Sequence, residues 1–320
     1  MASPNLSEIT TTTIRSRSRQ LADNVTENTA LLLRLRQRDK VRPVAGGETI
    51  LQELEYAENS TYKRYSGYET LNINASDVIS AAEFAWKQSA CAVSISGLEQ
   101  LKNSGREQMI DLLEARIGNA EKTMMNNLSS DLYSDGTADG GKQIGGLAAI
   151  VDTSPATGTV GGINAANFAF WRNHADTGTL ASIDADILGD MRTLWVELVR
   201  NRDKPDLIVA DNVTYSAFWG ALQNQQRFTN EELATAGFNN LKFNTADVVL
   251  DGGLGGDATT NTMYYLNTNF LFWRPHRDRD MVPLDPDRFA TNQDAMVKLI
   301  GWAGNLTVSN RELQGILTYS

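Results

Sequence analysis

The sequence predicts an α+β protein organised around one long helix. A helical pattern of apolar residues runs from about Ser104 to Tyr133, and helix-like and strand-like segments alternate from about 165 to 275. Before both lies a polar, tyrosine-rich segment, 48–73, which resembles two extended limbs joined by a turn. This segment has too few aliphatic residues to bury a face of its own, and an isolated two-stranded ribbon is marginal in water. The three observations indicate a mixed fold with a projecting hairpin.

Length and composition fit a globular protein. A chain of 320 residues can form one large or two modest cores. It contains no apolar run near the roughly 18 residues that span a bilayer, and its start, Met-Ala-Ser-Pro, resembles neither a signal peptide nor a myristoylation site. Cys91 is the single cysteine, so an internal disulfide is excluded, as suits a reducing cytoplasm. We therefore expect a soluble protein with no membrane partner.

Charge is distributed unevenly along the chain. Residues 1–42 contain eight basic and four acidic side chains, a net charge of +4, and because the whole chain carries −10 the remainder carries −14. A body this acidic repels nucleic acid, whereas a basic arm can reach an acidic surface, including that of a neighbouring copy.

The basic N-terminal region divides into two parts. Residues 1–20 have no apolar periodicity and predict a flexible arm, and a short helix is predicted from Leu21 to Arg38, ended by Pro43 and Gly46-Gly47. The helix could bind DNA or a membrane surface, but we favour an arm that packs on a partner subunit. Its candidate contact residues are Arg34, Arg36 and Arg38.

The predicted hairpin has one acidic limb and a basic, aromatic tip between Ala57 and Gly67. Four glutamates, at 48, 53, 55 and 58, line the rising limb. Because interfaces favour Tyr and Arg, we expect the hairpin to contact other copies of the chain, although an ordinary surface loop is the alternative. The candidate contact residues are Tyr56, Tyr62, Lys63, Arg64, Tyr65 and Tyr68.

The long helix and its flanks follow the hairpin. Ala82–Ser96 alternates and predicts a strand that leads through Gly97 into the helix. Ser104 and Glu107 form a capping box, and Gly136 is placed for a left-handed C-terminal cap. About thirty residues make a rod of roughly 45 Å, a structural spine. The apolar stripe of the spine consists of Ile110, Leu113, Ile117, Ala120, Met124 and Leu128.

A glycine-rich connection, 134–164, leads to an α/β module. We expect its helices at Ile183–Arg202 and Asn212–Gln225, and its strands at 207–210, 248–250, 263–266 and 270–273. Closing strands are predicted at 296–302, 306–308 and 315–318. Because the last strands need partners, we expect them to return to the sheet beside the spine.

Catalytic and ligand-binding motifs are weak. Gly136–Gln143 approaches a phosphate-binding loop, but Gln143 stands where Ser or Thr would hold Mg²⁺, and the loop follows a helix. Gly252–Gly256 has no helix pattern after it. His174 and His276 lack metal-ligand spacing, and Cys91 lies in a strand pattern typical of a buried thiol. We expect no enzyme activity, no cofactor and no metal site.

Several segments resemble one protein family. They are Ala82-Glu-Phe-Ala-Trp-Lys87, Ile95-Ser-Gly-Leu-Glu99, Leu132-Tyr-Ser-Asp-Gly136, and the end from Asn305-Leu to Gly315-Ile-Leu317. In this order, with the arm, hairpin, spine and module, the chain resembles the major capsid protein of tailed bacteriophages, which has the Hong Kong 97 type fold. The resemblance covers nearly the whole chain.

The resemblance implies an N-terminal arm (1–46), an extended E-loop (47–81), a peripheral domain of strand and spine (82–135) with closing strands (277–320), and an axial domain (136–276). It implies pentamers and hexamers that close into an icosahedral shell around double-stranded DNA, with the E-loop over one neighbour and the arm beneath another. The acidic wall would not hold the DNA. The expected location is the virion, after assembly in the cytoplasm of the bacterial host.

The resemblance also implies partners and leaves alternatives open. A portal is expected, a decoration protein is an option, and a separate scaffolding protein is favoured because 46 residues before the E-loop are too few for a built-in scaffold. Covalent cross-linking through Lys63 is not expected, because neither the acceptor nor the catalytic Glu of the family can be matched. An encapsulin-like cargo compartment shares the fold, and a soluble α/β enzyme using 136–143 or the His276 cluster is the alternative of another class.

Overall fold

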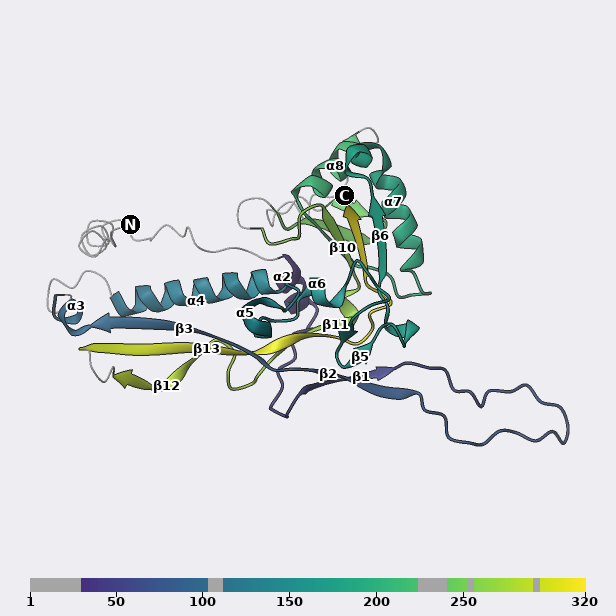
Figure 1. Ribbon diagram of the computed structural model, residues 1–320, viewed down its shortest axis with the longest axis horizontal. Coiled ribbons are helices and arrows are strands. Elements are labelled where there is room, and N and C mark those ends of the chain that lie inside the picture. The colour runs from purple at the N-terminus through teal and green to yellow at the C-terminus, as the bar shows by residue number, and fades with distance from the viewer. Residues whose placement is uncertain (1–29, 103–111, 224–240, 253–255, 290–293) are drawn as a thin grey trace.

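The computed structural model describes residues 30–102, 112–223, 241–252, 256–289 and 294–320. The chain forms two packed bodies from which one long hairpin projects (Figure 1). The helices are α2 (Ala30–Gln37), α3 (Gly97–Lys102), α4 (Leu112–Asp131), α5 (Ala138–Gly141), α6 (Leu147–Ile150), α7 (Ile183–Glu197) and α8 (Asn212–Gln223), with 3₁₀ turns η1 (Ala169–Trp171), η2 (Leu180–Ser182) and η4 (Thr268–Phe270). The strands are β1 (Ile50–Glu55), β2 (Ile79–Phe84), β3 (Lys87–Ser96), β4 (Thr159–Val160), β5 (Ile163–Asn164), β6 (His174–Gly178), β7 (Leu207–Ala210), β8 (Leu241–Phe243), β9 (Ala246–Leu250), β10 (Thr262–Leu266), β11 (Leu271–Pro275), β12 (Val282–Phe289), β13 (Ala295–Val308) and β14 (Gly315–Tyr319).

The first body is a four-stranded antiparallel sheet with α4 packed on one face. The long strand β13 pairs with β3 along one edge and with β12 and β11 along the other. Val93, Ile300 and Trp302 are buried in the same cluster as Met124 and Leu128 of α4. The alternating residues of the strands therefore form one face of this core, and the residues of α4 at helical spacing form the other.

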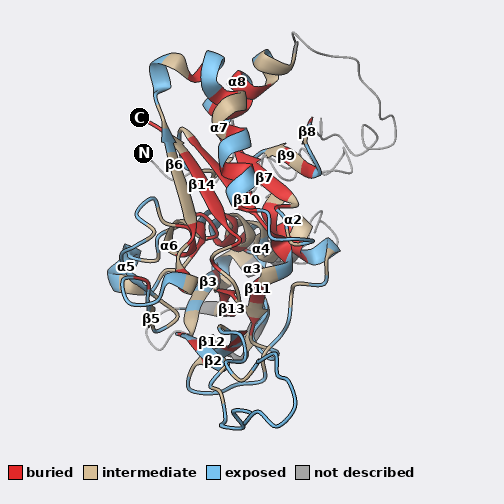
Figure 2. Ribbon diagram, turned by 90° about the vertical axis from the view of Figure 1, so that its right-hand side faces the viewer, coloured by how far each residue is buried: buried red, intermediate tan, exposed pale blue. Residues whose placement is uncertain are grey.

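The second body is a mixed six-stranded sheet in the order β6-β14-β10-β7-β9-β8. Ile208 and Met263 face α7 and α8 in one hydrophobic cluster. Their neighbours in sequence, Val209 and Tyr264, belong to the cluster around α4. Both faces of the central strands are covered, so β7 and β10 are buried at every residue (Figure 2), and the two bodies meet across this sheet.

The spine is confirmed over the part of the chain that the structure describes. Ala120, Met124 and Leu128 are buried and Ile117 packs beside them, whereas the capping pair Ser104 and Glu107 lies outside the described residues. The predicted C-terminal cap is misplaced. Gly136 is left-handed, with φ of 76°, but the helix ends at Asp131, where the next three N–H groups bond to carbonyls three residues back and tighten the chain.

The predicted strand Ala82–Ser96 is wrong as a single element. It is two strands in different sheets, because β2 pairs with β1 and β3 pairs with β13. The break at Ala85-Trp86 is held by side chains from elsewhere: Asn305 Nδ2 donates to the Ala85 carbonyl at 2.9 Å and Trp86 Nε1 donates to the Gly47 carbonyl at 2.9 Å. No local sequence pattern reports such long-range contacts.

The closing strands are partly as expected. The predicted segments 296–302 and 306–308 are one continuous strand, β13, beside the spine. The last strand is a correction, since β14 lies between β6 and β10 in the six-stranded sheet. The buried Arg311 holds the turn between β13 and β14 through the carbonyls of Ile150 and Trp171, which directs the chain end into the second body. In the module, β7 matches its prediction, α7 ends a few residues earlier than predicted, and α8 matches its prediction up to Gln223, beyond which the predicted residues 224 and 225 lie outside the described part of the chain.

Candidate subunit interface

The hairpin is a two-stranded antiparallel ribbon with a long distal loop. β1 and β2 pair from Ile50 opposite Phe84 to Glu55 opposite Ile79. This register places the midpoint of the loop at Gly67, whose φ of 60° is one that glycine readily adopts. The return limb is therefore 79–84, later than the predicted end of the hairpin at 73.

The base of the ribbon packs on the chain's own body. Ile50 and Leu54 of β1 and Ala82 and Phe84 of β2 are buried in the main cluster. Tyr56, one of the predicted contact residues, lies just beyond β1, and its ring is 5.3 Å from that of Phe170. Tyr56 thus belongs to the base of the hairpin and has a partner within the chain.

The distal loop, residues 56–78, leaves the body and is exposed over most of its length (Figures 1 and 2). The relative accessibility of Tyr62 is 78%, that of Tyr65 is 64% and that of Tyr68 is 108%. Lys63 pairs across the tip with Glu69 at 3.0 Å, and Arg64 is exposed. The aromatic rings of the tip therefore have apolar area that only another molecule can bury.

The face of the four-stranded sheet that points away from α4 is exposed along β3, whereas toward β11 it is covered, with Ala303, Asn305 and Thr307 of β13 buried. Alternate residues of β3, Ala90, Ala92 and Ser94, are exposed there, and the opposed residues of β13 share this face. Leu284 of β12 lies over Gly301, where an added Cβ would be 3.1 Å from its methyl groups. Small side chains make this face shallow and accessible to a flat partner.

Helix α2 corrects the interpretation of the arm. Leu31, Leu32 and Leu35 are buried in the chain's own main cluster, so the apolar face of α2 does not await a partner subunit. The leucines recur at i, i+1 and i+4, a spacing that lines one side of a helix, and this side fits between β11 and the six-stranded sheet. Leu33 is exposed, and the predicted residues 21–29 lie outside the described part of the chain.

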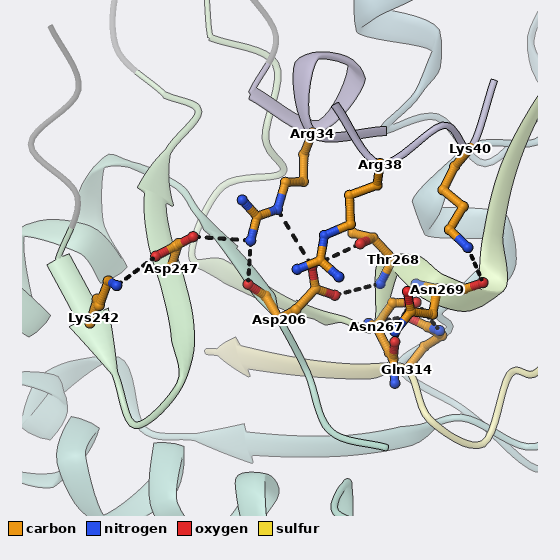
Figure 3. Close-up of polar contacts among 10 residues, drawn as sticks. All are labelled: Arg34, Arg38, Lys40, Asp206, Lys242, Asp247, Asn267, Thr268, Asn269 and Gln314. Atoms are coloured by element: carbon orange, nitrogen blue, oxygen red, sulfur yellow. Dashed lines mark hydrogen bonds and ion pairs between the residues drawn. The ribbon is translucent and has the colours of Figure 1, made fainter. Parts of the chain in front are cut away.

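Two of the three predicted arm arginines bind the second body (Figure 3). Arg34 lies 3.0 Å from Asp247 and 3.5 Å from Asp206, and Arg38 lies 3.2 Å from Asp206. Asp206 also accepts hydrogen bonds from the N–H and hydroxyl of Thr268. We call Arg34, Arg38, Asp206 and Asp247 the arm clamp. Arg36 is exposed and forms no ion pair with any described residue.

Two of the loops considered for chemistry, 136–143 and the one around His276, are described by the structure and show no ligand-binding arrangement, whereas 253–255 of the third lie outside the described residues. In 136–143, Asp139, Gly140 and Gly141 all have positive φ, so no helix N-terminus follows to face a phosphate. His276 packs its ring against Trp86 at 5.4 Å and accepts from the Asp278 N–H. Within the described ranges, no three His, Cys, Asp or Glu side chains converge as metal ligands. No helix in those ranges combines the length and apolarity needed to cross a membrane.

Of three comparisons with known proteins, the one with solved structures gives matches. No protein-family model and no curated protein sequence matches the chain. Among solved structures, a capsid subunit of cyanophage A-1(L) is 20% identical, with a TM-score of 0.66 over 93% of this chain and 94% of that one. The capsid of Myoviridae phage XM1 is 13% identical, with a TM-score of 0.55 over 95% and 96%.

A shell protein of another kind also matches. The SrpI encapsulin of Synechococcus elongatus PCC 7942 is 11% identical, with a TM-score of 0.52 over 96% of this chain and 94% of that one. All these matches extend over nearly the whole of both chains, so the similarity concerns the complete architecture. The predicted fold is confirmed: this chain has the phage capsid fold.

Proposed function

We propose that this chain is the major capsid protein of a tailed phage, which self-assembles as pentamers and hexamers into an icosahedral head shell around double-stranded DNA. One observation carries the proposal beyond the fold. A long hairpin projects from the body with its tyrosines exposed and with no apolar packing for its distal loop among the described residues. In a monomer, ordering such a loop costs conformational entropy that no apolar burial offsets.

In this proposal the hairpin is the E-loop and lies on the exposed face of β3 of a neighbouring copy. The small side chains at Ala90 and Ala92 leave room for the rings of Tyr62, Tyr65 and Tyr68. Such contacts are modest one by one and gain strength from repetition by symmetry. The segment before α2 is the arm that reaches another copy. The peripheral and axial domains correspond to the first and second bodies, except that β11 belongs to the first body and β14 to the second.

The charge of the chain supports enclosure of DNA without tight binding. Outside residues 1–42 the net charge is −14, and a wall of that sign does not hold a polyanion. A separate scaffolding protein, a portal and assembly in the host cytoplasm belong to the same proposal, with a decoration protein as an option and no covalent cross-link through Lys63.

The test is electron microscopy of the purified chain, expressed alone and with its scaffold, before and after removal of the loop. Wild-type protein should form closed shells. A variant in which residues 58–76 are replaced by Asn-Gly keeps the buried base of the ribbon, and it should stay folded but form no shells. As a matched control, Ser60→Ala and Ser76→Ala remove only the hydrogen bonds between Ser60 and the Ser76 hydroxyl and should leave assembly intact.

Two results would contradict the proposal. One is wild-type protein that stays monomeric at high concentration with scaffold present. The other is loop-deleted protein that still forms shells. Covalent linkage has its own assay, because shells boiled in detergent should run as monomers on a denaturing gel.

The second candidate is an encapsulin-like compartment, which the match to the SrpI encapsulin favours. Both candidates share the hairpin and the two bodies, so the content of the shell separates them. Shells that co-purify with an enzyme and remain small would support the compartment, whereas shells that depend on a scaffold would support the phage head.

A further inference from the structure

Three cations surround one aromatic ring at the edge of the first body. Lys40 Nζ lies 5.3 Å from the centre of the Phe272 ring, Arg42 Cζ lies 5.1 Å from it and Arg274 Cζ lies 5.2 Å from it. We call Lys40, Arg42 and Arg274 the cation cluster. The backbone enforces the grouping, because residues 40–44 run parallel to β11, with Arg42 N–H donating to the Trp273 carbonyl and Trp273 N–H donating to that of Lys40.

The described part of the chain gives the cation cluster no carboxylate partner. Lys40 donates to the Asn269 carbonyl at 3.1 Å, and Arg274 donates to Gln52 Oε1 at 2.7 Å. Asp206, whose charge acts on Lys40, is already paired with both arginines of the arm clamp. Burial, followed by repulsion from Arg42, lowers the pKa of both Lys40 and Arg274. Like charges held together in this way call for an anion from outside.

The outer face of the β1–β2 ribbon carries the opposite charge. Glu53 and Glu55 of β1 and Glu83 of β2 are exposed on the side away from the body, and none of them has an ion-pair partner among the described residues. The cation cluster of the same chain lies on the opposite side of the ribbon. It contacts the buried Gln52, and Gln52 and Glu53 point to opposite faces because side chains alternate along a strand. We call Glu53, Glu55 and Glu83 the acidic face.

We propose that the cation cluster of one copy binds the acidic face of the ribbon of a neighbouring copy. Each chain carries both halves of the contact, as association between identical subunits requires. Three unpaired cations meet three unpaired carboxylates, so the contact neutralises both groups. The inference rests on the proposed function and assigns the base of the hairpin, in addition to its tip, to the contact between subunits.

A second copy fits the cation cluster better than a nucleic acid. Nucleic-acid sites spread many cations along a surface to follow a phosphate chain, whereas here three converge on a single ring in a chain whose net charge is −10. The carboxylates at Glu53 and Glu55 are two residues apart, roughly 7 Å along a strand, a separation suited to two cations of one cluster.

The experiment is a charge exchange between the two surfaces in the full chain. Lys40→Glu with Arg42→Glu changes the charge of the cluster from +3 to −1, and Glu53→Arg with Glu55→Arg changes that of the acidic face from −3 to +1. Each change alone should lower the yield of shells at least tenfold under the condition in which wild-type protein assembles. The combined variant should return the yield to within about threefold of wild type, because the charges are again complementary. Thermal unfolding of each unassembled variant, within a few degrees of wild type, verifies its fold.

Neutral variants provide the matched controls. Lys40→Gln with Arg42→Gln, and Glu53→Gln with Glu55→Gln, should each reduce the yield less than the corresponding reversal. Wild-type yield from the variant with Lys40→Glu and Arg42→Glu, or a combined variant no better than either reversal alone, would overturn the inference while leaving shell formation in place. The inference would also be overturned if inorganic phosphate stabilised wild-type protein but not the variant with Lys40→Glu and Arg42→Glu, and if the combined variant did not recover the yield of shells, because the cluster would then bind phosphate. Absence of wild-type shells would instead refute the proposed function itself.

Discussion

The hydroxyl of Tyr133, at the end of the spine, donates a hydrogen bond to Oδ2 of Asp251, 118 residues later in the chain. Tyr133 follows α4 in the first body, and Asp251 follows β9 in the second. The Asp251 carboxyl also accepts from the backbone of Ala30, the first residue of α2. One buried carboxyl thus connects the spine, the α/β module and the arm helix.

The first prediction concerns pH. Burial raises the pKa of Asp251 to about 6, and Asp257 adds repulsion, so the folded chain holds a proton here that the unfolded chain releases near pH 4. Ionised Asp251 therefore costs stability above pH 6, and this cost disappears as the pH falls through 6 toward 4. Relative to Asp251→Asn, the wild-type unfolding free energy should rise by roughly 2–3 kcal/mol between pH 8 and pH 4. Urea titrations of both proteins across this pH range measure the difference in unfolding free energy. A difference that stays constant with pH would refute the prediction.

The second prediction tests the arm clamp. Arg34→Met should lower the unfolding free energy by about 1–2 kcal/mol, because it leaves Asp206 and Asp247, both mostly buried, with weaker pairing. Arg36→Met on the same helix is the control and should change little, since Arg36 is exposed. Chemical denaturation of both variants compares them. Equal effects at the two positions would mean that the clamp contributes nothing beyond helix propensity.

The third prediction concerns Arg311, which is fully buried and donates to two carbonyls and to Asn173 Oδ1. Burial lowers its pKa to about 10. Arg311→Lys keeps the charge but cannot make the three bonds of the planar fork, so it should cost about 2–4 kcal/mol of unfolding free energy. Arg200→Lys changes an arginine in an exposed ion pair and should be nearly neutral. A tolerated Arg311→Lys would show that charge alone suffices at this position.

The fourth prediction compares two glycines. A Cβ at Gly146 would overlap the carbonyl oxygens of Asp131 and Leu132, where the end of the spine contacts the start of α6. Gly146→Ala should therefore cost about 2–3 kcal/mol of unfolding free energy. Gly189, within α7, has open space around its Cβ position, and Gly189→Ala should raise stability by about 0.5–1 kcal/mol. Thermal unfolding should move in opposite directions for the two variants.

Local patterns in the sequence predicted the elements that bury a continuous stripe. The spine, β7 and the two module helices follow from apolar residues at regular spacing. The exposed hairpin tip followed from its lack of aliphatic residues. β6 was missed because Thr177 is the single β-branched residue in His174-Ala-Asp-Thr-Gly178, and the strand is ordered by pairing with β14.

The candidate interface could be predicted only in part. Tyr62, Tyr65 and Tyr68 are exposed as a contact surface requires, and their contact with a neighbour stays a prediction. The alternation in β1 indicates one acidic face, but the cation cluster had no signal in the sequence, since Lys40 and Arg274 are 234 positions apart. Arg34 and Arg38 have partners within the chain that no spacing rule reports.

The sequence by itself determined the long spine, the alternating module and a hairpin without a core, because these depend on periodicity over neighbouring residues. The tertiary structure alone decided that α2 packs on its own chain, that β14 joins the second body, and that three cations converge on Phe272. Each of these involves contacts between residues more than 100 positions apart, such as Arg34 with Asp206, Gly315 with His174 and Lys40 with Phe272. Such contacts form through the packing of whole elements, which local residue preferences do not encode.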